Sequence, residues 1–178
     1  MALIVEDGTG VSGAESYAAV ATVTAYWAAR SHRTQAAAWS GASDAAKEGA
    51  AREASQYLDA VYGSYYRGTR ASYDQGLLWP RSDALDDAGD ALPDLPPQIV
   101  SAACELAARA VSAPLIKDAE NANGIKRKRA KAGPAETETE YSGSAMTEPR
   151  YGAVGQMLAP VLNGAQPGAP RGSGWAWA

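Results

Sequence analysis

Apolar residues recur at helical spacing along three stretches of the chain, which predicts three main helices. The first runs from about 18 to 30, and the residues on its apolar face are Val20, Val23, Tyr26 and Trp27. The second begins at Ser43-Asp44, with Asp44 as the predicted N-cap, and its inward stripe comprises Ala46, Ala50, Ala54, Tyr57, Leu58 and Val61. The third begins at Pro96-Pro97, because proline is favoured in a first turn. It ends near Pro114, and its stripe is Ile99, Ala103, Leu106 and Ala110.

A short apolar run between the second and third helices ends in the corner Trp79-Pro80-Arg81. Trp79 precedes a proline and is therefore expected to be extended, and its indole would bury a large area where two helices cross. The planar guanidinium of Arg81 suits nearby carboxylates or carbonyl groups. We interpret Trp79, Pro80 and Arg81 as a structural corner that sets the angle between helices.

The segment from 126 to 141 predicts a β-hairpin that is polar on both faces. Basic residues come first, acidic residues alternating with threonine follow, and Gly133-Pro134 lies in the turn between them. A four-residue loop, 132–135, would set Lys131 against Glu136, Arg129 against Glu138 and Arg127 against Glu140, and each such pair is favourable. Such a hairpin has no face for a core. It is therefore expected to be solvated, to pair with another subunit, or to line a channel for DNA.

A short last helix is predicted from about 153 to 162, and Asn163-Gly164 ends it. The tail from 165 to 178 is rich in glycine and proline and carries Trp175 and Trp177, which we interpret as anchors for a partner. The predicted divisions are a helical-bundle core (1–116), the hairpin (117–145), the C-terminal helix (146–164) and the docking tail (165–178). The fold class is mainly α, a small helical bundle with a projecting β-hairpin and an extended C-terminal arm.

Composition and charge argue against several classes of protein, among them nucleic-acid-binding, secreted and membrane-spanning proteins. The net charge of −4 gives no global electrostatic case for binding nucleic acid. The single cysteine, Cys104, falls in a helical stretch and is expected to be a small buried hydrophobe. No apolar run is long enough to span a bilayer, and the first residues do not form a signal peptide. A soluble protein made in the cytoplasm, without a membrane partner, is expected.

Candidate catalytic and metal chemistry is sparse. The segment that contains Gly8 and Gly10 is not followed by the lysine and hydroxyl residue that complete a phosphate-binding loop. His32 is the only histidine, and the aspartates from Asp83 to Asp94 do not have the spacing of a calcium loop. A small hydrolase or metal enzyme would need side chains to converge at one of these places. We therefore expect no catalytic, cofactor or metal site.

Several of these motifs together resemble a known family. They are Glu6-Asp7-Gly8-Thr9-Gly10 followed by Ser16-Tyr17 and a helix, then Leu78-Trp79-Pro80-Arg81, then Leu95-Pro96 before an Ala-rich helix, and finally the hairpin. The chain resembles the head–tail connector (adaptor) proteins of tailed phages, a group that often carries the label DnaT-like single-stranded DNA-binding protein. The resemblance covers roughly residues 1 to 162.

The resemblance implies a structural head-completion protein of the virion, not an enzyme. Such proteins assemble as a ring, typically dodecameric, below the portal, where they extend the DNA channel and join the capsid to the next neck or tail protein. Docking on the portal would then fall to Met157, Leu158, Val161, Leu162, Trp175 and Trp177. Subunit pairing or channel lining, past double-stranded DNA that slides without sequence-specific contacts, would fall to Lys126, Arg127, Lys128, Arg129, Lys131, Glu136, Glu138 and Glu140.

The alternative is a single-stranded DNA-binding accessory protein of replication. Its binding residues would be the basic run from 126 to 131, together with Tyr65, Tyr66 and Arg67, whose planar groups could stack on bases. More often, however, a cluster such as Tyr65, Tyr66 and Arg67 simply seals the end of a helix. Salt-sensitive binding to oligonucleotides would favour the replication hypothesis.

Overall fold

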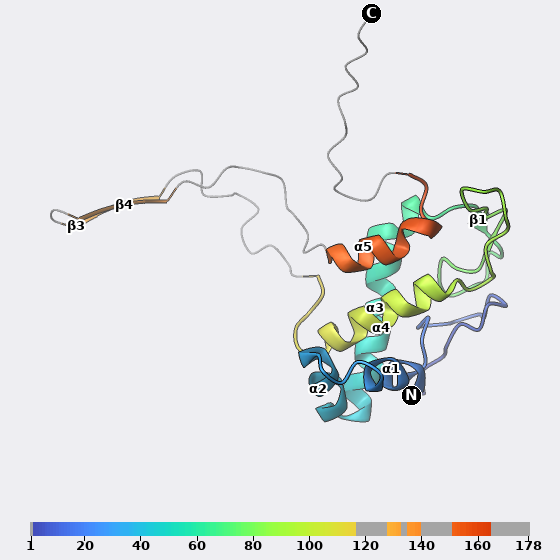
Figure 1. The fold of residues 1–178 in the computed structure, drawn as a ribbon, viewed down its shortest axis with the longest axis horizontal. Helices are drawn as coiled ribbons and strands as arrows, with labels where there is room; N and C mark the ends of the chain where they lie inside the picture. Colours follow the sequence, from blue (N-terminus) through green and yellow to red (C-terminus); the bar gives the residue numbers. More distant parts are fainter. Residues whose placement is uncertain (1, 117–127, 133–134, 140–150, 165–178) are drawn as a thin grey trace, which may run out of the picture. The chain divides into compact units, whose positions relative to one another are not determined.

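The computed structural model describes residues 2–116, 128–132, 135–139 and 151–164 (Figure 1). Within these ranges the chain is mainly helical, as predicted, with five α-helices and two antiparallel sheets of two strands each. The chain divides into two compact units, one formed by residues 1–115 with the segment from 151 onward, the other by residues 116–150. None of the described helices is long and apolar enough to cross a bilayer.

The centre of the first unit is the pair of helices α3 (Asp44–Tyr62) and α4 (Pro97–Ala110), which pack against each other more extensively than any other pair of described helices. The hydroxyl of Ser43 accepts a hydrogen bond of 3.3 Å from the backbone N–H of Ala46. The N-cap is therefore Ser43, and the predicted cap Asp44 is instead the first helical residue. Ala46 is exposed, contrary to the prediction, because the buried face of α3 begins one turn later.

Helix α4 is buried on nearly every side because α1, α2, α3 and α5 all pack against it. Its start at Pro97 agrees with the prediction, and its end at Ala110 falls a few residues before the predicted one. Every residue from Ala102 to Ala108 is buried. The alanines in this run are small, so the neighbouring helices can approach α4 closely from several directions. Cys104 is among the buried residues of this run, as predicted.

Helices α1 (Val20–Ala28) and α2 (Thr34–Gly41) lie near the N-terminal end of α3 in Figure 1. Val23 and Trp27 on α1 are buried, as the predicted face requires. Helix α2 was not predicted. It has no side-chain cap and buries only Ala36 and Trp39, so tertiary packing rather than helix propensity must hold it.

A small ribbon follows α3 and the short 3₁₀ helix η1 (Gly63–Tyr65). Strand β1 (Thr69–Arg70) pairs with β2 (Arg81–Ser82), which continues directly from the Trp79-Pro80 corner. Gly68 precedes β1 with a φ of +70°, and a Cβ there would lie 2.3 Å from the carbonyl oxygen of Ser82. Only glycine therefore allows the two segments to meet at this distance.

The C-terminal part of the first unit is α5 (Gly152–Leu158), followed by the 3₁₀ helix η2 (Ala159–Val161). Together they match the predicted last helix. The N–H of Arg67 donates to the carbonyl of Val161 (3.1 Å), and that of Asn163 donates to the carbonyl of Tyr65 (2.7 Å). These bonds fix the C-terminal segment to the chain that leaves α3.

The second unit contains the predicted hairpin. Strand β3 (Lys128–Ala132) pairs antiparallel with β4 (Ala135–Thr139), with Lys131 opposite Glu136 and Arg129 opposite Glu138. The predicted register is therefore correct, although Ala132 and Ala135 pair with each other and belong to the strands instead of the loop. The predicted pair of Arg127 with Glu140, and the arm from 165 to 178, lie outside the described residues.

Candidate interaction surfaces

The Trp79-Pro80-Arg81 corner lies inside the first unit. Trp79 is fully buried, and its ring meets that of Tyr66 edge to face, with centroids 5.9 Å apart. The guanidinium of Arg81 donates hydrogen bonds of 2.6 Å to the carbonyl oxygens of both Arg67 and Gly68. The peptide bond between Trp79 and Pro80 is cis. The corner thus holds β2 against the chain that leaves α3, and it leaves none of the indole surface for a ligand.

A partly buried hydrogen-bond network connects this corner to α3 and to the N-terminal segment. The carboxylate of Asp59 accepts from the hydroxyl of Tyr17 (2.6 Å) and from the backbone N–H of Leu78 (2.9 Å). The Tyr17 oxygen in turn accepts from the N–H of Trp79 (3.1 Å). Burial raises the pKa of Asp59 to about 6 against the hydrogen bonds that lower it, and burial also raises the pKa of Tyr17.

The N-terminal motif 6–10 is organised by the side chain of Glu6, which is 2% exposed. Its carboxylate accepts three backbone hydrogen bonds of 2.9 Å, from the N–H groups of Gly8, Gly10 and Val11. A phosphate-binding loop needs such N–H groups for its ligand. Here the chain's own carboxylate occupies them, so the loop is closed to an anion.

The cluster of Tyr65, Tyr66 and Arg67 is largely unavailable for stacking on bases, which agrees with the interpretation that it seals the end of a helix. Tyr66 is 2% exposed and packs on Trp79. The guanidinium of Arg67 donates to the carbonyls of Leu162 and Leu85 and pairs with Asp87. Tyr65 is half-buried. The cluster seals the end of α3, because a backbone that turns sharply there needs its polar groups paired.

The four predicted docking residues near the C-terminus do not share one surface. Leu158, Val161 and Leu162 are at most 1% exposed and belong to the core of the chain itself. A docking role for these three is therefore inconsistent with this conformation, because their side chains already pack internally. Met157 is half-buried and lines a hollow of about 340 Å³ with Tyr26, Arg30, Pro97, Gln98 and Ser101. Trp175 and Trp177 lie outside the described residues.

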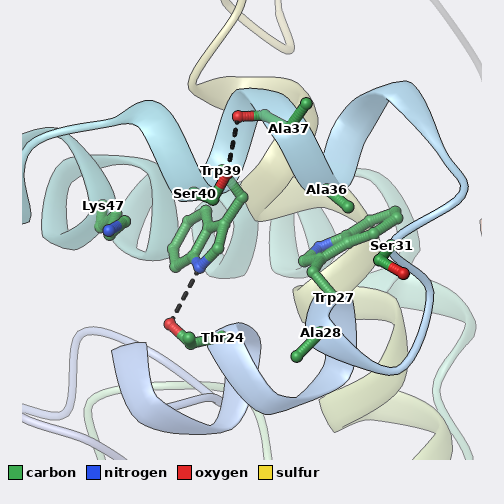
Figure 2. Close-up of a pocket in the computed structure, with 9 residues that line it drawn as sticks. All are labelled: Thr24, Trp27, Ala28, Ser31, Ala36, Ala37, Trp39, Ser40 and Lys47. Atoms are coloured by element: carbon green, nitrogen blue, oxygen red, sulfur yellow. Dashed lines mark hydrogen bonds between the residues drawn. The ribbon is translucent and has the colours of Figure 1, made fainter.

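A second hollow, of about 450 Å³, lies between α1 and α2 (Figure 2). Trp27 from α1 and Trp39 from α2 form its walls, and the indole N–H of Trp39 donates to the hydroxyl of Thr24 (3.0 Å). Lys47 at the start of α3 is the one charged residue among the described residues that line it. The lining holds no acid–base pair, so its chemistry is that of apolar contact beside a cation.

The remaining candidate groups do not converge. His32 is exposed on the turn between α1 and α2. Asp86 accepts hydrogen bonds from the N–H groups of Ala88 and Asp90, which stabilises the acidic loop locally. Burial raises the pKa of the Cys104 thiol to about 12, so it is a poor nucleophile. In the described ranges, no three histidine, cysteine or acidic side chains gather as metal ligands would.

The sequence analysis did not identify the buried acid of α4. Glu105 on α4 is 1% exposed, and it accepts hydrogen bonds from the Tyr26 hydroxyl (2.9 Å) and the Arg109 guanidinium (2.6 Å). The spacing of Glu105 and Arg109 is that of an i,i+4 ion pair, which was the available signal. Tyr26 and Arg33 are far from Glu105 in the sequence, and the fold brings them to it. The Arg33 guanidinium lies 3.7 Å from the Glu105 carboxylate.

Comparison with known proteins gives a single kind of match. No curated protein and no solved structure matches the chain. A family model described as "Putative DnaT-like ssDNA binding protein" matches residues 1–172. That match spans both compact units and nearly the whole sequence. The chain therefore belongs to the family with the description "Putative DnaT-like ssDNA binding protein".

Proposed function

We propose that this chain is a non-catalytic adaptor of a phage neck, which assembles as a ring below the portal and joins the capsid to the tail. The observation that carries the proposal is the hairpin register, in which Arg129 lies opposite Glu138 and Lys131 opposite Glu136. One face of this strand pair carries the charged pairs, and the other carries only alanine, threonine and Lys128, so the pair offers little apolar surface to a core. It is suited to a water-filled channel or to contact between subunits.

The net charge and the charge pattern of the hairpin support a channel through which DNA passes without being bound. The chain has a net charge of −4, and the cations at two positions of β3 have acids opposite them in β4. Tight DNA binding draws on unpaired cations that displace counterions. A ring of such subunits would let double-stranded DNA slide through without gripping it.

Contact with the portal would use surfaces that the core leaves free. Leu158, Val161 and Leu162 pack inside the chain, so Met157 and its hollow remain, with the tail residues Trp175 and Trp177 as further anchors. The proposed localisation is the virion neck, with a neck or tail protein as the second neighbour.

Co-sedimentation with portal rings from the same phage genome tests this proposal. We compare the full chain with a version cut after Gly164, which lacks both tail tryptophans. Binding of the full chain alone would assign the anchor to the tail, and binding of both would assign it to the bundle. If neither sediments with the portal, the adaptor proposal is wrong.

A second candidate function is binding of single-stranded DNA, and the description of the family favours it more directly than it favours the adaptor. With Tyr66 and Arg67 engaged inside the fold, binding would rest on Tyr65 and the basic strand β3. Fluorescence anisotropy with a labelled oligonucleotide tests it. Affinity that falls steeply with salt, and is lost in the R129E/K131E variant, would support it.

A further inference from the structure

The two strands of the hairpin carry opposite charge. Strand β3 contains Lys128, Arg129 and Lys131 and no acid, while β4 contains Glu136 and Glu138 and no base. The register sets the second and fourth residues of β3 opposite acids of β4. One outer edge of this sheet therefore belongs to a basic strand, and the other to an acidic strand.

Both edges lack a further strand within the described residues, since the sheet consists of β3 and β4 alone. Every strand at the edge of a sheet has a row of backbone N–H and C=O groups that can pair with another chain. An isolated two-stranded hairpin is also only marginally stable in water. Addition of strands from outside would satisfy these groups and would stabilise the hairpin.

We propose that neighbouring copies of this chain pair edge to edge, with the acidic strand β4 of one copy beside the basic strand β3 of the next. This inference rests on the proposed ring. Rotation about an axis along the strands keeps all hairpins in one orientation, so β4 of one copy runs antiparallel to β3 of its neighbour. Successive hairpins then form a closed up-and-down barrel, which abolishes free edges.

The charges also select this arrangement over its competitor. A two-fold pairing of β3 with β3 would bring Arg129 and Lys131 against the same cations of the second copy, and like charges on adjacent strands are destabilising. Pairing of β4 with β3 repeats the register of opposite charges that each hairpin has between its own two strands. It is a heterologous contact, and contacts of this type generate rings when the rotation closes.

A charge-exchanged variant separates pairing between copies from pairing within one hairpin. In R129E/K131E/E136K/E138K, the pairs 129–138 and 131–136 keep opposite charges, so the hairpin itself is preserved. Two neighbouring variant copies also place opposite charges on the two strands of their shared edge. A variant hairpin beside an original one, however, sets acid against acid or base against base at the shared edge.

The experiment mixes differently tagged original and variant full-length chains at equal concentration and determines ring composition by native mass spectrometry. We expect each protein to form rings alone, and mixed contacts to be depleted about tenfold relative to random assembly. Rings of random composition would overturn the edge pairing and leave the adaptor proposal standing. The absence of rings from both proteins would overturn the pairing and count against the adaptor as well.

Discussion

The carboxylate of Asp59 on α3 accepts a 2.6 Å hydrogen bond from the hydroxyl of Tyr17, 42 residues earlier in the chain. The same carboxylate accepts from the N–H of Leu78, and the Tyr17 oxygen accepts from the N–H of Trp79. Three segments that are distant in sequence thus meet at one half-buried acid. Because unpaired buried polar groups are costly, this network makes the position of the Trp79 corner specific.

The Asp59→Asn variant is expected to remove a distinct pH dependence of stability. The pKa of Asp59 is raised from 3.8 to about 6 in the folded protein. The contribution of Asp59 to stability is therefore fully present at pH values below its pKa in the unfolded chain. It is lost as the pH rises through the pKa of Asp59 in the folded protein. From pH 4 to pH 7, the stability of the original protein minus that of the variant should fall by up to about 3 kcal/mol. Urea denaturation at several pH values measures this difference, and parallel profiles would contradict it.

Two tyrosines in the same region are expected to respond in opposite ways to replacement by phenylalanine. Tyr17→Phe removes the hydroxyl that bonds Asp59 and Trp79, and should destabilise the fold by about 1–3 kcal/mol. The hydroxyl of Tyr66 is buried and has no hydrogen-bond partner among the described residues, so Tyr66→Phe should be neutral or stabilising by about 1 kcal/mol. Thermal unfolding compares the two, and equal losses of stability would show that the network is not specific.

Glu6→Gln is expected to loosen the N-terminal motif. The amide would direct a donor toward backbone N–H groups that now share the carboxylate, which should cost about 1–3 kcal/mol. Asp7→Asn is the matched control, because Asp7 is exposed and its carboxylate accepts hydrogen bonds from its near neighbour Thr9. Hydrogen exchange at Gly8, Gly10 and Val11 should accelerate in the first variant alone. Unchanged exchange there would refute the role of Glu6.

Arg81→Lys tests whether a planar guanidinium is needed at the corner. Lysine cannot reproduce the paired bonds to the carbonyls of Arg67 and Gly68, so we expect a loss of about 1–3 kcal/mol. Arg33→Lys is the control, because the Arg33 side chain is 47% exposed and its guanidinium lies 3.7 Å from the carboxylate of Glu105. A similar stability of both variants in urea would mean that positive charge alone suffices.

The sequence was informative wherever a pattern is local. The stripes of α3 and α4 are long, and the alternating charges around Gly133-Pro134 determine a register through their spacing alone. Helix α2 escaped prediction because it has eight residues, no cap and only two buried side chains. The contacts of Asp59 with Tyr17 and of Arg81 with Gly68 join residues that only the folded chain brings together. No local period reports such contacts.

The most direct measurement sediments one preparation of the full chain, in the same low-salt buffer, with portal rings and separately with a polythymidine oligonucleotide. The adaptor account predicts that the chain sediments with portal rings and leaves the oligonucleotide free. Salt-sensitive binding of the oligonucleotide without any association with the portal would contradict it, and would assign the chain the activity that its family description names.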